Sequence, residues 1–204
     1  MTDKLTIALD GDRLKESLEQ QNLQEKVAVK VGFEKQYTPD ALPKTLNLSV
    51  TNQSDQVIYV DWDSSAILKK GGRSRRTIRL TPYKSPDLSQ AQAWSAIAPS
   101  STLQEQITAE DALTPSKDNP EILEPAKPLI EVKGDPKDKK KDQEFKDFMA
   151  GKITLSFSMC LVIRATGAPV EANGDRLLPS GIQTYLLHCD FILKKSPWTD
   201  VVPW

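Results

Sequence analysis

The residues of this sequence that could support nucleophilic chemistry are His188, which is the one histidine, and the cysteines Cys160 and Cys189. A thiol becomes a nucleophile when an imidazole lies within hydrogen-bond reach and takes its proton. His188 and Cys189 are neighbours in a segment with strand periodicity, so their side chains point to opposite faces. Cys160, on a partner strand, could approach His188, but a structural role for both is the favoured interpretation. We therefore expect a chain that is not an enzyme and uses no cofactor.

Oxygen atoms that could bind calcium recur along Asp61-Trp62-Asp63-Ser64-Ser65. Ala66 stands where an EF-hand loop requires glycine, and no glutamate closes the loop. The favoured interpretation is a turn after a strand, because Asp and Ser side chains bond their own backbone there. No glycine-rich phosphate loop and no cluster with zinc-ligand spacing occurs, so we expect no metal or nucleotide.

Positive charge is concentrated between Lys69 and Arg79, around the pair Gly71-Gly72 and without an acidic residue. Guanidinium groups match the oxygens of phosphate, so this segment could bind RNA, DNA or anionic lipid. The favoured alternative is an exposed edge hairpin whose charges discourage strand addition, some of them paired with acidic residues elsewhere. No aromatic side chain for base stacking lies inside the segment, which disfavours nucleic acid. The candidate anion-binding residues are Lys69, Lys70, Arg73, Arg75, Arg76 and Arg79.

The last residues, from Ser196 to Trp204, contain the pair Pro-Trp twice. Such a tail either folds back over the domain or presents rigid aromatic anchors to another protein, since tryptophan is enriched at binding hot spots. The candidate partner-binding residues are Pro197, Trp198, Pro203 and Trp204.

The elements that must position these residues are strands. Apolar residues occupy every second position from Ile153 to Ile163, and from Tyr185 to Leu193 within the segment Ile182 to Lys194, which predicts two long, half-buried strands paired as a hairpin. Alternation also predicts strands at 27–33, 46–50 and 58–62, with weaker candidates at 5–9, 75–80 and 103–107. The polar turn at 52–55 predicts that 46–62 forms an antiparallel hairpin.

Seven or eight short strands without alternating helices predict a mainly β fold, an immunoglobulin-like antiparallel β-sandwich with short peripheral helices. The strand, polar turn and strand from Asn47 to Trp62 resembles the central strands of such domains in a general way. Cys160 and Cys189 fall on different strand faces, which argues against the inter-sheet disulfide of antibody domains.

Two short helices are expected, one capped by Asp12 and carrying Leu14 and Leu18, the other capped by Asp142. The Pro-rich and charged segment 115–142 predicts an extended excursion that ends in a flexible loop. The strands after this segment are too few to bury their own faces, so we expect one sandwich domain over 1–204, with an insertion at 115–142 and a tail at 196–204.

Composition limits the partners. The chain is 38% hydrophobic and 27% charged with a net charge of -1, so it can fold but creates no global field for polyanions. No apolar run approaches the roughly 20 residues of a membrane span, and the first residues lack a signal-peptide core, which predicts a soluble protein in the cytoplasm, free or peripheral to a membrane or complex. We expect a non-enzymatic protein–protein interaction or assembly module; the alternative is an anion-binding module that uses residues 69–79.

Overall fold

The computed structural model describes residues 4–69, 73–80, 88–166, 169–172, 176–179 and 181–196. The chain is mainly β, as the alternating pattern predicts, and its largest sheet is antiparallel and nine-stranded. The strands of that sheet are β1 (Leu5–Leu9), β2 (Val27–Gly32), β3 (Leu46–Asn52), β4 (Ile58–Lys69), β5 (Arg73–Arg79), β6 (Ser95–Ile97), β7 (Thr102–Ala109), β10 (Leu155–Thr166) and β13 (Ile182–Lys195).

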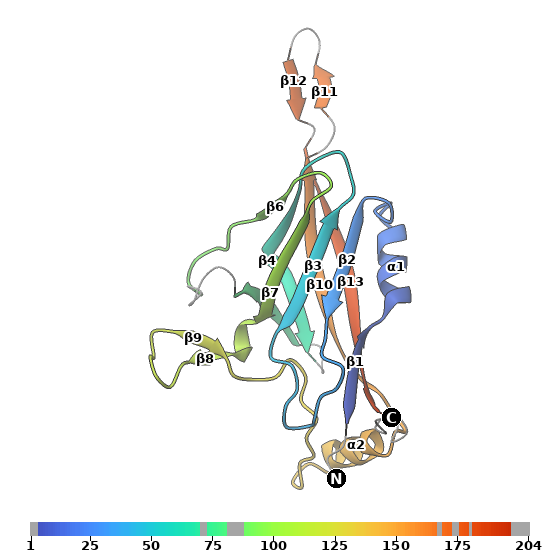
Figure 1. The fold of residues 1–204 in the computed structure, drawn as a ribbon, viewed down its shortest axis with the longest axis vertical. Helices are drawn as coiled ribbons and strands as arrows, with labels where there is room; N and C mark the ends of the chain where they lie inside the picture. Colours follow the sequence, from blue (N-terminus) through green and yellow to red (C-terminus); the bar gives the residue numbers. More distant parts are fainter. Residues whose placement is uncertain are drawn as a thin grey trace, which may run out of the picture.

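The sheet curls into a nearly closed barrel (Figure 1). Its strand order is β1-β13-β10-β4-β5-β7-β3-β2, with β6 beside β4. Strand β5 connects the two sides, because Arg73–Arg76 pairs with β4 and Thr77–Arg79 pairs with β7. The barrel thus has two sides joined by β5, which we call its layers; the sandwich and its immunoglobulin-like type stay predictions.

The hairpin of β10 and β13 is confirmed. Its register runs from Leu155 opposite Leu193 to Thr166 opposite Ile182. The connection between β10 and β13 contains a two-stranded ribbon, formed by β11 (Pro169–Ala172) and β12 (Arg176–Pro179), which projects from the barrel (Figure 1).

The predicted hairpin over 46–62 is wrong. β3 pairs with β2 and β7, whereas β4 pairs with β10, β5 and β6, so the turn between them crosses from one layer to the other. The buried side chain of Asn52 holds this crossing: its amide donates to Gln56 O at 2.7 Å and Ile97 O at 2.9 Å, and its oxygen accepts from Ser54 N at 3.0 Å. A polar turn therefore marks a reversal here without pairing the strands that flank it.

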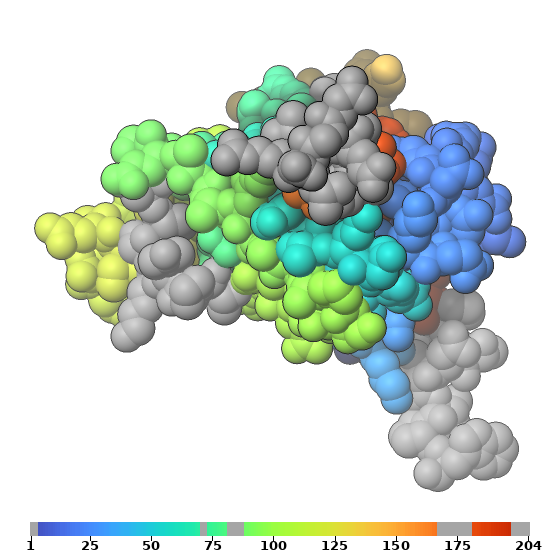
Figure 2. All heavy atoms as spheres, turned by 90° about the horizontal axis from the view of Figure 1, so that it is seen from above, coloured from blue at the N-terminus to red at the C-terminus, as the bar shows by residue number. Residues whose placement is uncertain are grey.

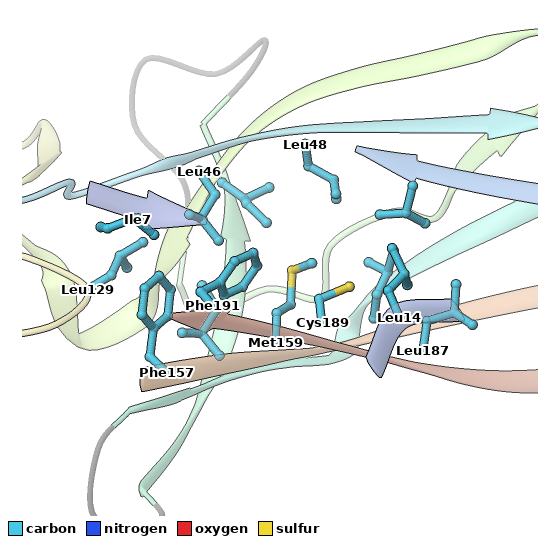
Figure 3. Packing of buried hydrophobic residues seen from close by; sticks show 14 of the residues in the cluster. Ile7, Leu14, Leu46, Leu48, Leu129, Phe157, Met159, Leu187, Cys189 and Phe191 are labelled. Carbon is cyan, nitrogen blue, oxygen red and sulfur yellow. The ribbon is translucent and has the colours of Figure 1, made fainter. Parts of the chain in front are cut away.

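The core lies between the two layers (Figure 3). Leu46 and Leu48 of one layer point toward Phe157 and Met159 of the other in that view. Phe191 packs edge-on against Phe33, with ring centroids 5.6 Å apart, and lies 4.8 Å from Phe157. The period-2 pattern thus places alternate residues of both layers in one apolar interior.

Both helices begin before the expected caps. Helix α1 (Gly11–Glu19) is capped by Asp10, whose carboxylate accepts from Arg13 N, and α2 (Lys139–Met149) is capped by Asp138, whose carboxylate accepts from Lys140 N and Lys141 N. In each helix an aspartate earlier in the chain was available to cap the first turn. Among the described residues no helix is long and apolar enough to cross a membrane.

The segment 115–142 is not simply the extended excursion that the sequence predicts, because part of it packs against the barrel. It follows the short strand β8 (Leu113–Pro115), pairs through β9 (Leu123–Pro125) to form a small ribbon that projects to one side (Figure 2), and then buries Leu129, Ile130 and Val132. Leu129 N donates to Pro43 O at 2.9 Å. Strands before and after the segment share one sheet; the single-domain organisation stays a prediction.

Candidate protein-interaction face

A wide bulge interrupts the pairing of β4 with β10. Val162 lies opposite Asp61 and Cys160 lies opposite Ala66, so Trp62 to Ser65 stand against one residue of β10. The bulge is held from within, because Ser65 Oγ donates to Asp61 O at 2.6 Å and accepts from Val162 N at 2.9 Å. Bulges of this kind redirect side chains next to functional surfaces.

The bulge turns the carboxylate of Asp61 toward Arg164 of β10. Arg164 Nε and Nη2 both donate to Asp61 Oδ2, at 2.9 and 2.7 Å, although Asp61 is only 3% exposed. Burial by itself raises the pKa of Asp61, but the hydrogen bonds from Arg164 and Ser64 outweigh it and hold the pKa below its usual value. Asp61 is therefore a buried anion that fixes and neutralises the guanidinium above it.

The guanidinium of Arg164 also makes a cation–π contact with an aromatic ring. Its carbon lies 5.1 Å from the ring centroid of Trp94, and Trp94 packs against Tyr59 at 6.1 Å. On the other side Arg164 Nη1 donates to Thr184 Oγ1 of β13 at 2.7 Å. Trp94, Arg164 and Thr184 thus form one row across the outer face of β4, β10 and β13.

Exposed apolar side chains gather on this same face. Among the described residues four large apolar side chains are exposed: Ile153 (38%), Trp94 (43%), Leu186 (47%) and Ile182 (57%). Ile182, Thr184 and Leu186 occupy alternate positions of β13, so they share the face that Thr184 presents to Arg164. We call the outer face formed by Tyr59, Trp94, Arg164, Ile182, Thr184 and Leu186 the Trp94–Leu186 face.

The predicted basic segment is paired with acidic residues. Lys69 Nζ lies 2.7 Å from Asp111 Oδ1, and Arg75 Nε donates to Asp111 Oδ2 at 3.1 Å. Burial raises the pKa of Asp111, but the hydrogen bonds from these two cations outweigh it, so the pKa of Asp111 is lowered overall. Two of the candidate cations therefore share one carboxylate.

Arg76 and Arg79 also lie beside acidic residues. Arg76 contacts Asp63 at 3.6 Å and Glu110 at 3.4 Å. Arg79 lies 3.5 Å from Glu105, donates to Ser95 Oγ at 2.9 Å and packs 5.7 Å from the ring of the buried Trp62.

Of the remaining two candidate cations, Arg73 is exposed and Lys70 lies outside the described residues. Charge density along the sequence therefore overstates the free positive charge of this hairpin.

The carboxylates of Asp61 and Asp63, which the sequence offered as oxygen ligands for calcium, have protein partners in the bulge. Asp61 binds Arg164, whereas Asp63 accepts from Gln92 N at 2.8 Å and contacts Arg76. The two carboxylates thus serve different cations of the protein. Within the described part of the chain no group of three or more His, Cys, Asp or Glu residues is placed to hold a metal ion.

Cys160 and His188 lie directly opposite each other in the register of β10 and β13. Burial raises the pKa of the Cys160 thiol, and it raises that of Cys189 to about 12. Both cysteines are free, and they lie on opposite faces of their strands, as expected. The register puts the two side chains on one face of the sheet, while burial of Cys160 disfavours its thiolate form.

The candidate tail residues Pro197, Trp198, Pro203 and Trp204 lie outside the described residues. Sequence reasoning did not single out Arg164 or Trp94. The signal available for Arg164 was a lone charge inside a long apolar strand, next to the core residue Ile163.

The chain matches no protein-family model, no curated protein and no solved structure. The functional interpretation therefore rests on the geometry described above.

Proposed function

We propose that the chain is a non-enzymatic protein-interaction or assembly module that docks a protein partner on the Trp94–Leu186 face. The observation that carries this proposal is the clustering of Trp94, Ile182 and Leu186 on one sheet face; they are three of the four large apolar side chains that are exposed among the described residues. Tryptophan, tyrosine and arginine are the residue types that dominate binding energy at protein interfaces. The immunoglobulin-like sandwich and the cytoplasmic location stay part of this proposal.

The chemistry of the face specifies the partner. Arg164 is neutralised by Asp61 beneath it, and Tyr59, Trp94, Ile182, Thr184 and Leu186 carry no charge. A partner with a compensating charge gains little here, whereas a partner surface of apolar side chains buries the exposed aliphatic and aromatic groups. The proposed occupant is accordingly a protein surface that is apolar and uncharged at its centre.

Rigidity of the face supports the same function. Trp94 is held between Arg164 and Tyr59, and Arg164 is fixed by Asp61 and Thr184. Anchors that are already ordered lose less conformational entropy when they bind. The buried Asp61 thus supports binding through the guanidinium that it positions.

The test is affinity purification from a native lysate with four forms of the full chain: wild type, Ile182→Glu, Leu186→Glu and Ile153→Glu. Ile153 is the matched control, because its side chain is also exposed and apolar but lies before β10, outside the face. We expect a stoichiometric partner to be retained by wild type and Ile153→Glu and lost by both face variants. Binding should change less than about threefold between 0.1 and 0.5 M salt, since apolar contacts are not screened.

Three outcomes would contradict the proposal. They are recovery of no partner, equal recovery by the face variants, and equal loss in the Ile153→Glu control. Circular dichroism and thermal unfolding of each variant establish that a lost partner does not reflect a lost fold.

A further inference from the structure

Among the described residues, no strand pairs with one edge of the upper half of β13, by which we mean Ile182 to Cys189. β13 extends over 14 residues, but β1 has five and pairs only with Phe191–Lys195. In an antiparallel ladder alternate residues turn their backbone groups to opposite sides. Leu187 and Cys189 therefore bond β10, while Leu186 and His188 turn their backbone groups to the open side.

Side chains of α1 and the turn after it occupy that open side. Gln21 Oε1 accepts from Leu186 N at 2.8 Å, and Gln21 Nε2 donates to Leu186 O at 2.6 Å. Ser17 Oγ accepts from His188 N at 3.0 Å and lies 3.4 Å from Leu186 O. The amide of Gln21 thus makes with Leu186 the two hydrogen bonds that a residue of a neighbouring strand would make.

This edge carries none of the charges or prolines that usually discourage pairing with another chain. Natural edge strands carry charges, prolines or bulges, or they are covered by another element. From Ile182 to Cys189 the sequence contains no Lys, Arg, Asp, Glu or Pro, and it is rich in strand-forming residues. The other end of the sheet differs, because β2 carries the exposed Lys30 at its centre. Coverage by α1 is therefore the protection of the β13 edge.

We propose that the upper edge of β13 is a strand-pairing site for a second copy of this chain, and that Ser17 of α1 and Gln21 of the turn after it cover this edge. Antiparallel pairing of two such edges places no like charges opposite each other, since the segment from Ile182 to Cys189 has no acidic or basic residue apart from His188. Helix α1 has nine residues and buries Leu14 and Leu18, and its Arg13 lies 3.6 Å from Asp190 of β13. This inference is independent of the docking face.

The test compares the full chain with the double variant Ser17→Ala/Gln21→Ala. The matched control is Gln20→Ala, because Gln20 is exposed and its side chain bonds only Glu16 of the same helix. Residue-resolved hydrogen exchange reports the edge directly. At low protein concentration we expect the amides of Leu186 and His188 to exchange about tenfold faster in the double variant, while those of Leu187 and Cys189 keep their protection.

Self-association is the second measurement. Sedimentation should show wild type and Gln20→Ala as monomers and the double variant as a concentration-dependent dimer. In the dimer the amides of Leu186 and His188 should become protected again, because the partner strand replaces the cover. If the double variant does not fold, Gln21→Glu tests the same edge, since it removes the Nε2 donor and leaves Ser17 in place.

Two results would overturn the proposal. Unchanged exchange at Leu186 and His188 would show that α1 does not protect the edge. Faster exchange with no dimer at any concentration would show that the uncovered edge does not pair.

Discussion

Arg164 and Asp61, 103 residues apart in the sequence, are joined by two hydrogen bonds of 2.9 and 2.7 Å that converge on one carboxylate oxygen of Asp61. The aspartate is buried and the arginine reaches the surface beneath Trp94. The pair links the bulge of β4 to β10.

Replacement of Asp61 by Asn should destabilise the fold by about 3 kcal/mol at pH 7, because it leaves Arg164 without its anion in a partly buried site. Since the folded-state pKa of Asp61 lies below its unfolded value, the carboxylate stabilises the wild type above about pH 4, and this stabilisation is lost as the pH falls through the folded pKa. Denaturant titrations from pH 2.5 to pH 7 should therefore show a smaller acid loss in Asp61→Asn. An equal acid loss in both proteins would contradict this assignment.

Alkylation of the cysteines should be slow at neutral pH. Burial raises the pKa of Cys160 and raises that of Cys189 to about 12, so little thiolate is present. We expect iodoacetamide to modify Cys160 slowly and Cys189 hardly at all, compared with the same chain in denaturant. Rapid labelling of Cys160 at neutral pH would instead favour a catalytic pair with His188, and Cys160→Ser identifies the labelled site.

Truncation of Phe191 to Ala should cost about 3–5 kcal/mol of unfolding free energy, because its fully buried ring packs against Phe33 and Phe157 between the two layers. Ile153→Ala is the surface comparison and should change stability by about 0.5 kcal/mol or less. Urea unfolding followed by tryptophan fluorescence gives both values. Similar losses in the two variants would place Phe191 outside the core.

Retention on heparin tests the anion-binding alternative. The ion pairs of Lys69, Arg75 and Arg76 reduce the free positive charge of residues 69–79, so wild type and the triple variant Arg73→Glu/Arg75→Glu/Arg76→Glu should elute at similar, low salt. Thermal unfolding of the variant checks that its fold persists. Strong, salt-dependent retention of the wild type that the variant loses would favour anion binding.

The sequence predicted the long hairpin of β10 and β13 correctly because its signal is local. Each strand has apolar residues at every second position over much of its length, and two such strands joined by turn residues pair with each other. The same logic failed for Leu46 to Trp62. A turn rich in Asn, Ser and Asp reverses the chain, but local pattern does not encode which strand becomes the neighbour. Only the burial of Asn52 between the layers shows that β3 and β4 separate.

The candidate surfaces, too, were predictable from the sequence only in part. The sequence by itself determined the mainly β class, the alternation that puts Ile182 and Leu186 on one strand face, and the charge density from Lys69 to Arg79. Tertiary structure decided that Asp111 pairs with two of those cations, that Asp61 neutralises Arg164, and that Gln21 covers the edge of β13. Periodicity depends on neighbouring residues along the chain, whereas ion pairs and edge coverage depend on groups that only the folded sheet brings within hydrogen-bond distance.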